Sequence, residues 1–499
     1  MFKKILIANR GEIAVRIIRA CRDMGINTVA IYSDADRNSM HVTLADEAYR
    51  IGGPKPSESY LLKEKVIEIA KSSGAEAIHP GFGFLSENDS FAEMCEKEGI
   101  VFIGPSAESI RLMGDKITAR KIAKESDVPL VPGSEGAVTD VEANRVAEKI
   151  GVPLMVKASA GGGGKGMRLV KDMNEFKSAL RMARSEAQSA FGDDSVFIER
   201  FVEKPRHIEI QILADSHGNT LHLFERECSI QRRHQKVIEE APSGFISAKT
   251  RKEMGKTAVR IAKAVNYRGA GTVEFIMDQN ENFYFLEMNT RIQVEHPVTE
   301  MITGIDIVKW MIKIAHGEKL PFKQSKLKIN GHAVQCRVYA EDPGMNFLPS
   351  PGKLEYVSAP SGPGIRDDSS IFSGYEVTSY YDPMLSKLIV WGENRKDAVN
   401  RMASALREYI VLGVKTNLGF LIRVMQNDEF RKADIDTGFI ERHPELLTPD
   451  TDNIESSLIA AAICIDNFQE KGQDTGAGKP TSNWKILSRR LGVSRNMMI

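Results

Sequence analysis

Cysteine is scarce in this chain of 499 residues: there are five, at Cys21, Cys95, Cys228, Cys336 and Cys464. They lie far apart in the sequence, so they form neither the close pairs of a zinc site nor the dense pattern of a disulfide-stabilised domain. Chains without such a framework belong by default to a reducing compartment, and we therefore expect a cytoplasmic protein.

Long apolar runs and an excess of one charge are also missing. The first residues, MFKKILIANRGE, hold too short an apolar run for a secretory signal, and no run elsewhere is long enough to span a bilayer. Lys plus Arg and Asp plus Glu number 67 each. Net charge therefore gives no reason to expect a nucleic acid or a membrane as partner. The length is enough for about three or four domains.

The stretch from Gly271 to Glu295 is the most informative part of the chain. Residues 271–277 and 283–286 are typical of two strands separated by a turn cluster, which indicates a β-hairpin. Beyond the hairpin, polar residues alternate with mostly apolar ones, and an extended chain points successive side chains to opposite faces. The polar side chains expected on one face are Glu287, Asn289, Arg291, Gln293 and Glu295.

Two acidic residues should face each other in this hairpin. If its loop is residues 279–282, Glu274 lies directly opposite Glu287. Cross-strand neighbours are about 4.5–5.5 Å apart at Cβ, and like charges so placed destabilise a sheet unless they share a cation or a proton. Asn289 adds a third oxygen, so we predict Mg²⁺ held by Glu274, Glu287 and Asn289. The alternative is a solvated polar face.

The N-terminal segment alternates strands with helices. Strands are expected at residues 3–8, 28–32, 75–79 and 100–103, and helices at 13–24, 61–72 and 91–98. This order predicts a doubly wound parallel sheet over residues 1–112. No G-x-G-x-x-G follows the first strand, so no dinucleotide site is predicted. The loop from His79 to Asn88 follows a strand and either contacts a ligand or serves as a rigid connector.

A glycine run at residues 160–167 lies between two expected strands within a compact block, residues 129–203, whose size suits an inserted lid. Bare glycine backbone lets N–H groups approach phosphate oxygens, and Lys165 adds a positive charge. No Ser or Thr follows Lys165, so this is not a Walker A loop. Ordering four glycines costs roughly 1 kcal/mol each relative to alanine. That cost favours a loop that closes on a ligand over a flexible hairpin tip. Lys157, on the preceding strand, is a second candidate for phosphate.

A basic segment follows, with Gln231, Arg232, Arg233, His234 and Lys236 close together. It is either a solvated basic loop or an anion site in which a lysine reaches a small carboxylate-like anion.

Two further strands carry polar residues in register. In residues 207–213, His207, Glu209 and Gln211 share one face, although a single histidine in a strand is usually structural. In residues 332–339, Arg337 shares a face with Gln335.

Together these features predict ATP-dependent activation of an oxyanion. A metal site, a glycine-rich lid and candidate phosphate lysines supply positioning and charge stabilisation. The alternation puts Glu295 on the same face as the proposed metal ligands. The metal does not need it as a ligand, so Glu295 can act as a general base.

Four motifs carry a resemblance to a known family. They are IANRGE at residues 7–12, GGGGKGM at 161–167, QRRHQK at 231–236 and EMNTRIQVEHPVTE at 287–300. The chain resembles the biotin carboxylase subunits of biotin-dependent carboxylases, which are ATP-grasp enzymes, from about residue 3 to residue 445. The family binds Mg²⁺ (or Mn²⁺) and ATP and converts bicarbonate to carboxyphosphate. It then transfers CO₂ to the ureido nitrogen of biotin on a carrier.

The resemblance implies a role for each matching residue. The metal ligands are Glu274, Glu287 and Asn289. ATP is contacted by Lys116, Lys157, Gly163, Gly164, Glu199, Val202, His207, Gln231 and His234, together with Glu274 and Glu287. Bicarbonate is bound by Lys236, Arg291, Gln293 and the Val294 backbone, and Glu295 deprotonates it. Arg337 steadies the oxygen of deprotonated biotin.

One position departs from the family pattern. Phe82 stands where the family usually has a tyrosine close to biotin, so any hydrogen bond from that hydroxyl is lost.

The resemblance also implies an α/β (in part α+β) ATP-grasp fold. The expected domains are an N-terminal doubly wound domain at 1–112, an ATP-grasp domain at 113–330 with its lid at 129–203, a C-terminal domain at 331–445, and a helical and flexible tail at 446–499.

The partners follow from what the chain lacks. No Ala-Met-Lys-Met biotinylation motif occurs, and the chain is too short for a carboxyltransferase domain. Biotin is therefore expected on a carrier protein or a biotinylated carboxyltransferase subunit, and the family often forms homodimers. The tail resembles that of the corresponding subunits of two-subunit pyruvate or acyl-CoA carboxylases, which leaves the final carboxyl acceptor open. Two alternatives stay open: another ATP-grasp ligase, and a non-catalytic nucleotide-binding subunit.

Overall fold

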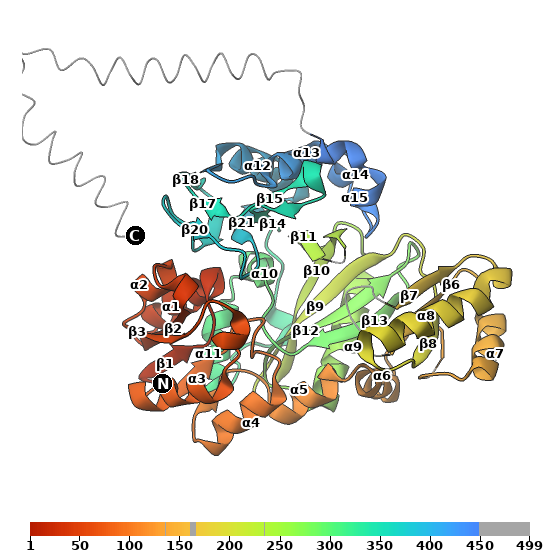
Figure 1. Ribbon diagram of the computed structural model, residues 1–499, viewed down its shortest axis with the longest axis horizontal. Coiled ribbons are helices and arrows are strands. Elements are labelled where there is room, and N and C mark those ends of the chain that lie inside the picture. The colour runs from red at the N-terminus through yellow and green to blue at the C-terminus, as the bar shows by residue number, and fades with distance from the viewer. Residues whose placement is uncertain (135, 160–165, 234, 449–499) are drawn as a thin grey trace, which may run out of the picture. The chain divides into compact units, whose positions relative to one another are not determined.

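The computed structural model describes residues 1–134, 136–159, 166–233 and 235–448 (Figure 1). Among these residues, no helix is both long and apolar enough to cross a bilayer.

The N-terminal segment folds around a parallel sheet of strand order β3-β2-β1-β4-β5. Its strands are β1 (Lys4–Ile7), β2 (Asn27–Ser33), β3 (Glu47–Gly52), β4 (Ala77–His79) and β5 (Val101–Phe102). Helices α1 (Gly11–Asp23), α2 (Met40–Leu44), α3 (Lys63–Ser73) and α4 (Asp89–Lys97) connect them. The predicted parallel sheet is confirmed. The edge strand β3 was missed because it alternates partly and fully exposed residues over most of its length, and so lacks the apolar run of a buried strand.

A second sheet has eight strands in the order β13-β12-β9-β10-β11-β14-β21-β19, and each pair of neighbours is antiparallel. In chain order, the first five strands of this sheet are β9 (Arg206–Ala214), β10 (Thr220–Arg232), β11 (Gln235–Ala241), β12 (Gly269–Met277) and β13 (Phe283–Asn289). The others are β14 (His332–Tyr339), β19 (Ile365–Ser369) and β21 (Met384–Gly392). The sheet continues past residue 330 because β14 pairs with β11.

Strand β9 shows how this sheet is filled. Ile208, Ile210 and Ile212 belong to an apolar core that also contains residues of helix α9 (Ala248–Ala264), which lies against β9 and β10 in Figure 1. Glu209 and Gln211, which alternate with them, are also completely buried. The second face of β9 therefore buries polar side chains, and these need hydrogen-bond partners.

The hairpin β12–β13 confirms the predicted pairing of its two glutamates, but with a different loop. Glu274 pairs with Glu287, as predicted, but Met277 pairs with Phe283, so the loop is residues 278–282 and not 279–282. A β-bulge next to Glu274 absorbs the difference and leaves Leu286 without a partner. Leu286 is 41% exposed.

The expectation that the chain stays extended to Glu295 was wrong. Strand β13 ends at Asn289, residues 290–294 form an irregular turn, and helix α10 (His296–Thr303) starts with Glu295 as its N-cap. Pro297 in the first turn of α10 suits a helix start, because its missing N–H has no intrahelical partner there. Gln293 and Glu295 therefore approach the sheet from a turn.

Residues 140–200 hold a small sheet of order β7-β6-β8. Its elements are β6 (Leu154–Ala158), β7 (Met167–Val170), β8 (Val196–Arg200), α7 (Asp140–Ile150) and α8 (Phe176–Phe191), as predicted within a few residues. They have a core of their own that includes Leu154, Val156 and Ile198.

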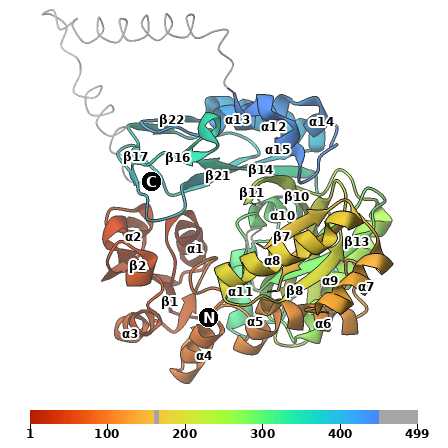
Figure 2. The same cartoon turned by 45° about the vertical axis from the view of Figure 1, so that its right-hand side comes forward.

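Helices α12 (Arg395–Glu408) and α13 (Leu418–Gln426) cover the C-terminal part of the large sheet, where Figure 2 shows α12 beside β21. The other helices are α5 (Ala107–Gly114), α6 (Lys116–Glu125), α11 (Ile307–Ala315), α14 (Asp428–Arg431) and α15 (Phe439–Arg442). Short strands are β15 (Glu341–Asp342), β16 (Leu348–Pro349), β17 (Gly352–Lys353), β18 (Tyr356–Ser358), β20 (Glu376–Val377) and β22 (Ile410–Leu412).

Candidate active site

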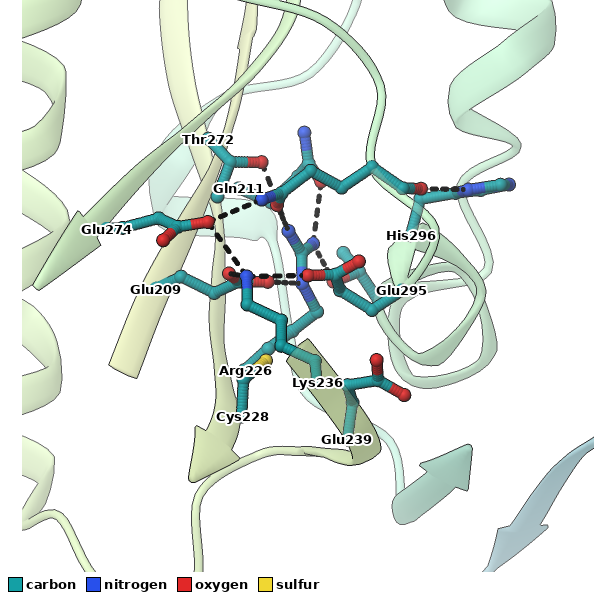
Figure 3. A network of polar contacts seen from close by, with 12 residues as sticks. Glu209, Gln211, Arg226, Cys228, Lys236, Glu239, Thr272, Glu274, Glu295 and His296 are labelled. Atoms are coloured by element: carbon teal, nitrogen blue, oxygen red, sulfur yellow. Dashed lines mark hydrogen bonds and ion pairs between the residues drawn. The ribbon is translucent and has the colours of Figure 1, made fainter. Parts of the chain in front are cut away.

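Lys236, on β11, is the centre of a buried charge cluster (Figure 3). Its ammonium donates to Glu209 at 2.5 Å, Glu274 at 2.8 Å and Glu295 at 2.7 Å. An ammonium has three donors, so every one is used. Burial alone would lower the pKa of Lys236, but the three carboxylates raise it well above its ordinary value. Lys236 is therefore a fixed positive charge.

Glu295 lies between two cations. Its second oxygen accepts from Arg337 Nη2 at 3.1 Å. Burial would raise the pKa of Glu295, but Lys236, Arg337 and Arg226 hold it well below its usual range. Such a carboxylate is ionised, yet it is a weak base until a positive neighbour turns away from it.

Arg337, on β14, is held by a second acid. Its Nε donates to Glu239 at 2.6 Å, and Gln335 Nε2 donates to the other oxygen of Glu239 at 3.0 Å. The prediction that Gln335 and Arg337 share a face is confirmed. Burial would lower the pKa of Arg337, but Glu239 raises it well above its ordinary value.

The two opposed hairpin acids differ in their electrostatic surroundings. Glu274 accepts from Lys236 and lies 2.8 Å from His207 Nε2. Burial would raise the pKa of Glu274, but these neighbours hold it well below its usual value. Burial raises the pKa of Glu287, and the charge of Glu274 raises it further. The charges of Lys116, Lys236 and His207 lower it by less, so the pKa stays above its ordinary value.

These surroundings fit a divalent cation at the hairpin. Glu287 is a partly buried carboxylate beside a second negative charge, and a cation removes the repulsion between the two. Asn289 Oδ1 accepts from Arg291 Nη2 at 2.8 Å, and the second lone pair of this oxygen leaves Asn289 able to act as a ligand. Ligand atoms of His207, Glu209 and Glu274 also lie within 4.8 Å of one another. The ammonium of Lys236 already bonds the two glutamates of that group.

Arg291 is fastened by the loop that follows β4. Its Nε donates to Glu87 Oε2 at 2.8 Å, and the Thr290 N–H donates to Glu87 Oε1 at 3.1 Å. The loop 79–88 therefore holds the turn after β13.

Three protein families match most of the chain. Residues 1–110 match the N-terminal domain of biotin carboxylase, and residues 335–442 match its C-terminal domain. Residues 115–323 match the ATP binding domain of the carbamoyl-phosphate synthase L chain. A pyruvate carboxylase subunit of Methanothermobacter thermautotrophicus is 53% identical over 444 residues, which are 89% of this chain and 90% of that protein.

The chain belongs to the biotin carboxylase family. The biotin carboxylase of a Nostoc species is 53% identical over 441 residues, 88% of this chain and 99% of that one. A solved structure is the biotin carboxylase domain dimer of Hydrogenobacter thermophilus 2-oxoglutarate carboxylase with MgADP, ADP and bicarbonate. It has a TM-score of 0.85 and 50% identity, covering 90% of this chain and 99% of that chain. The predicted ATP-grasp biotin carboxylase fold is therefore confirmed.

In this biotin carboxylase, the other expected ATP residues lie on several elements. Lys116 is the first residue of α6. Burial and the charge of Glu274 raise the pKa of Glu287, and the positive charge of Lys116 opposes that rise. Lys157, on β6, donates to Glu199 on β8 at 2.6 Å, and Arg120 also bonds that carboxylate. Val202 lies just beyond β8 and is buried.

Two residues of the basic segment, Gln231 and Arg232, end β10, and Lys236 lies on β11. Gln231 pairs with Lys236, and its side-chain amide donates to the Cys228 carbonyl at 2.8 Å. Arg232 bonds Glu341 at 3.1 Å and lies over the Phe347 ring. Lys236 therefore reaches the charge cluster, whereas Arg232 joins the C-terminal segment. His234, Gly163 and Gly164 lie outside the described residues.

Phe82, where the sequence resemblance leads us to expect a tyrosine, lies beside residues of the first motif. Asn9 Nδ2 donates to the carbonyls of Pro80 and Phe82, each at 2.7 Å. Lys387 Nζ lies 6.0 Å from the Phe82 ring centroid and 2.9 Å from Glu12. The IANRGE motif thus supports the loop that carries Phe82. Val294 lies between Gln293 and Glu295 in the turn before α10.

Four buried or loop residues that the fold brings to the cluster had no predicted role: Glu87, Glu209, Arg226 and Glu239. The alternation of His207, Glu209 and Gln211 was the one usable signal, because polar residues on strands buried on both faces need partners. Contacts of Arg226 and Glu239 join distant elements and leave no local pattern.

Proposed function

We propose that this chain carboxylates biotin carried by another polypeptide, using ATP and bicarbonate and passing through carboxyphosphate. One observation carries the proposal. A candidate base, Glu295, shares a single buried cluster with an anion-binding lysine, Lys236, and with one acid of the metal pair, Glu274. Proton removal and phosphoryl transfer to the same oxyanion need such a shared site.

Glu274 and Glu287 would hold Mg²⁺ or Mn²⁺, with Asn289 as a third ligand. When bound, the metal neutralises charge on the triphosphate. Lys116 and Lys157, the glycine segment with Gly163 and Gly164, and residues Glu199, Val202, His207, Gln231 and His234 are the proposed ATP contacts. The position of Lys116 near Glu287 supports this assignment.

Bicarbonate is proposed to bind Lys236, Arg291, Gln293 and the Val294 backbone. Lys236 now bonds three carboxylates, so an incoming anion that takes one of its donors weakens its hold on Glu295. The pKa of Glu295 then rises toward the range in which a carboxylate removes a proton effectively. We propose that Arg337, held by Glu239, steadies the oxygen of deprotonated biotin and that Phe82 is a second biotin contact.

The matched ranges support domains at residues 1–112, 113–330 with a lid at 129–203, and 331–445, followed by a tail. We further propose a homodimer, because the related 2-oxoglutarate carboxylase domain is a dimer. The biotin partner is a carrier protein or a carboxyltransferase subunit. Free thiols at Cys21, Cys95, Cys228 and Cys336 support a cytoplasmic location.

The test follows radiolabelled bicarbonate into acid-labile carboxybiotin with the purified chain, Mg-ATP and free biotin. We expect incorporation that requires all three, with one ADP released per label at saturating biotin. ATP cleavage that needs another acid in place of bicarbonate would indicate a different ATP-grasp ligase. Nucleotide binding without any turnover would indicate a regulatory role.

A further inference from the structure

Arg226, on β10, is a completely buried arginine beside the charge cluster. Figure 3 shows its guanidinium behind Lys236, between Glu209 and Glu295. Neither the reaction nor the family matches assign it a task. A guanidinium has five N–H donors in a rigid planar fork, and burying one is costly unless the donors find acceptors.

All three nitrogens of Arg226 are bonded. Nε donates to Glu209 at 2.5 Å, Nη1 to Gln211 at 2.6 Å and Thr299 at 3.0 Å, and Nη2 to Thr272 at 3.1 Å and Gln293 at 2.7 Å. The acceptors come from β9, β12, the turn after β13 and α10. One side chain therefore joins the strands of the site to the turn that carries the proposed bicarbonate ligands.

The first consequence concerns the orientation of Gln293. Its Oε1 accepts from Arg226, so its NH₂ group must point the other way, and Nε2 donates to Glu274 Oε1 at 2.7 Å. Without the guanidinium, the amide oxygen loses this donor, and the bond from Nε2 to Glu274 alone holds the amide in its orientation. An anion requires the N–H side.

The second consequence concerns Glu209. One of its oxygens accepts from Arg226 and the other from Lys236, both at 2.5 Å. Arg226 thus holds Glu209 in the orientation that keeps Lys236 beside Glu295.

We propose that Arg226 is a positioning residue for the bicarbonate site: its fork fixes the amide of Gln293 with N–H toward the anion and aligns Lys236 through Glu209. This inference rests on the proposed function. Arg226 itself touches no substrate, and it acts through the two residues that it bonds.

The test is Arg226→Lys, which keeps the charge but replaces the fork by a point charge that cannot reach five acceptors. We expect the KM for bicarbonate in ATP cleavage to rise about 10- to 100-fold, the effect of losing one hydrogen bond to a charged group. The Kd of Mg-ADP, measured by calorimetry, should change less than about threefold, because Arg226 contacts none of the proposed nucleotide residues. An equal loss of nucleotide affinity would overturn the proposal.

A double-mutant cycle with Gln293→Ala separates positioning from general damage. In the Gln293→Ala background, Arg226→Lys should raise the bicarbonate KM by a smaller factor than in the wild-type chain, because the route through Gln293 is gone and only the route through Glu209 remains. Additive effects would contradict the proposal. The matched control is Arg206→Lys. Arg206 is a buried arginine of the same sheet that bonds the Ala433 carbonyl, and this change should leave the bicarbonate KM unaltered.

A milder variant covers the case in which Arg226→Lys does not fold. Thr272→Val removes one acceptor of the same Nη2 and keeps every charge, and it should raise the bicarbonate KM about threefold. An unchanged KM would count against the proposal.

A crystal structure of the folded variant decides the positioning claim independently of activity. We expect Gln293 to leave Glu274, and an unmoved amide would refute the claim. A wild-type chain without bicarbonate-dependent ATP cleavage would instead refute the proposed function, and the crystal structure would still decide the role of Arg226.

Discussion

The central strands β1 and β9 of the two main sheets are both buried on two faces, but different side chains cover those faces. In the N-terminal sheet, Ile5, Leu6 and Ile7 of β1 are all fully buried. In the eight-stranded sheet, β9 alternates isoleucines with Glu209 and Gln211, which are also fully buried. Apolar burial stabilises a fold directly, whereas buried charges cost desolvation that their pairing only offsets. The first sheet is built for stability, and the second sheet gives up stability to hold a reactive arrangement of charges.

The largest expected effect that would test this contrast is on chemistry. Glu295→Ala should lower bicarbonate-dependent ATP cleavage about 10²- to 10⁴-fold, because it removes the proposed base. The Kd of Mg-ADP should stay within a few-fold of wild type. Steady-state kinetics and calorimetry measure the two quantities. Lost nucleotide binding would instead give Glu295 a structural role.

A buried charge cluster away from the site should affect stability rather than rate. Glu240 bonds His332 at 2.8 Å and Arg395 at 2.7 Å. Burial would raise the pKa of Glu240, but Arg395 and His332 lower it to about 2. We expect Glu240→Gln to remove about 3 kcal/mol of unfolding free energy at pH 7.

The sign of that pH dependence follows from the lowered pKa. The stabilisation is complete above the unfolded pKa of Glu240, near 4.5, and is lost as the pH falls toward about 2. Urea unfolding of wild type and variant should therefore converge over this range. A difference that stays constant with pH would show that Glu240 acts by packing.

Glu287→Gln should separate function from stability at the metal pair. Turnover should fall about 100-fold or more, because one ligand of the proposed metal is lost. The metal-free chain should become more stable by about 0.2–1 kcal/mol, because burial and the charge of Glu274 raise the pKa of Glu287. Thermal unfolding in EDTA measures the gain, which should grow as the pH rises above the ordinary value of 4.5. A destabilised metal-free variant would contradict the account of repulsion.

The smallest effect is expected in the N-terminal sheet. Ile7→Val should lower the unfolding free energy by about 1 kcal/mol, the cost of a lost methylene in a packed core. The KM values for ATP and bicarbonate should not change. Altered bicarbonate kinetics would show that packing in the N-terminal sheet also affects the site in the eight-stranded sheet.

Several features were predictable from sequence because they are local. The alternation in residues 1–112 predicted the parallel sheet, and the lid elements lie within a few residues of their predicted ranges. The pairing of Glu274 with Glu287 was also predicted, although the bulge that secures it was not. The predicted extended run to Glu295 was wrong because the chain leaves the strand after Asn289 and turns into α10, and this turn does not change the polar alternation.

The amino-acid sequence by itself determined the residue types at the site and the face on which each strand presents them, since side-chain periodicity is a property of neighbouring residues. Tertiary structure alone decided which polar groups from distant elements meet. Lys236 and Glu295 are 59 positions apart, Arg226 and Gln293 are 67 apart, and Arg291 and Glu87 are 204 apart. Such pairs form because packing excludes water from several elements at once, and each buried charge must then find its partner across the fold.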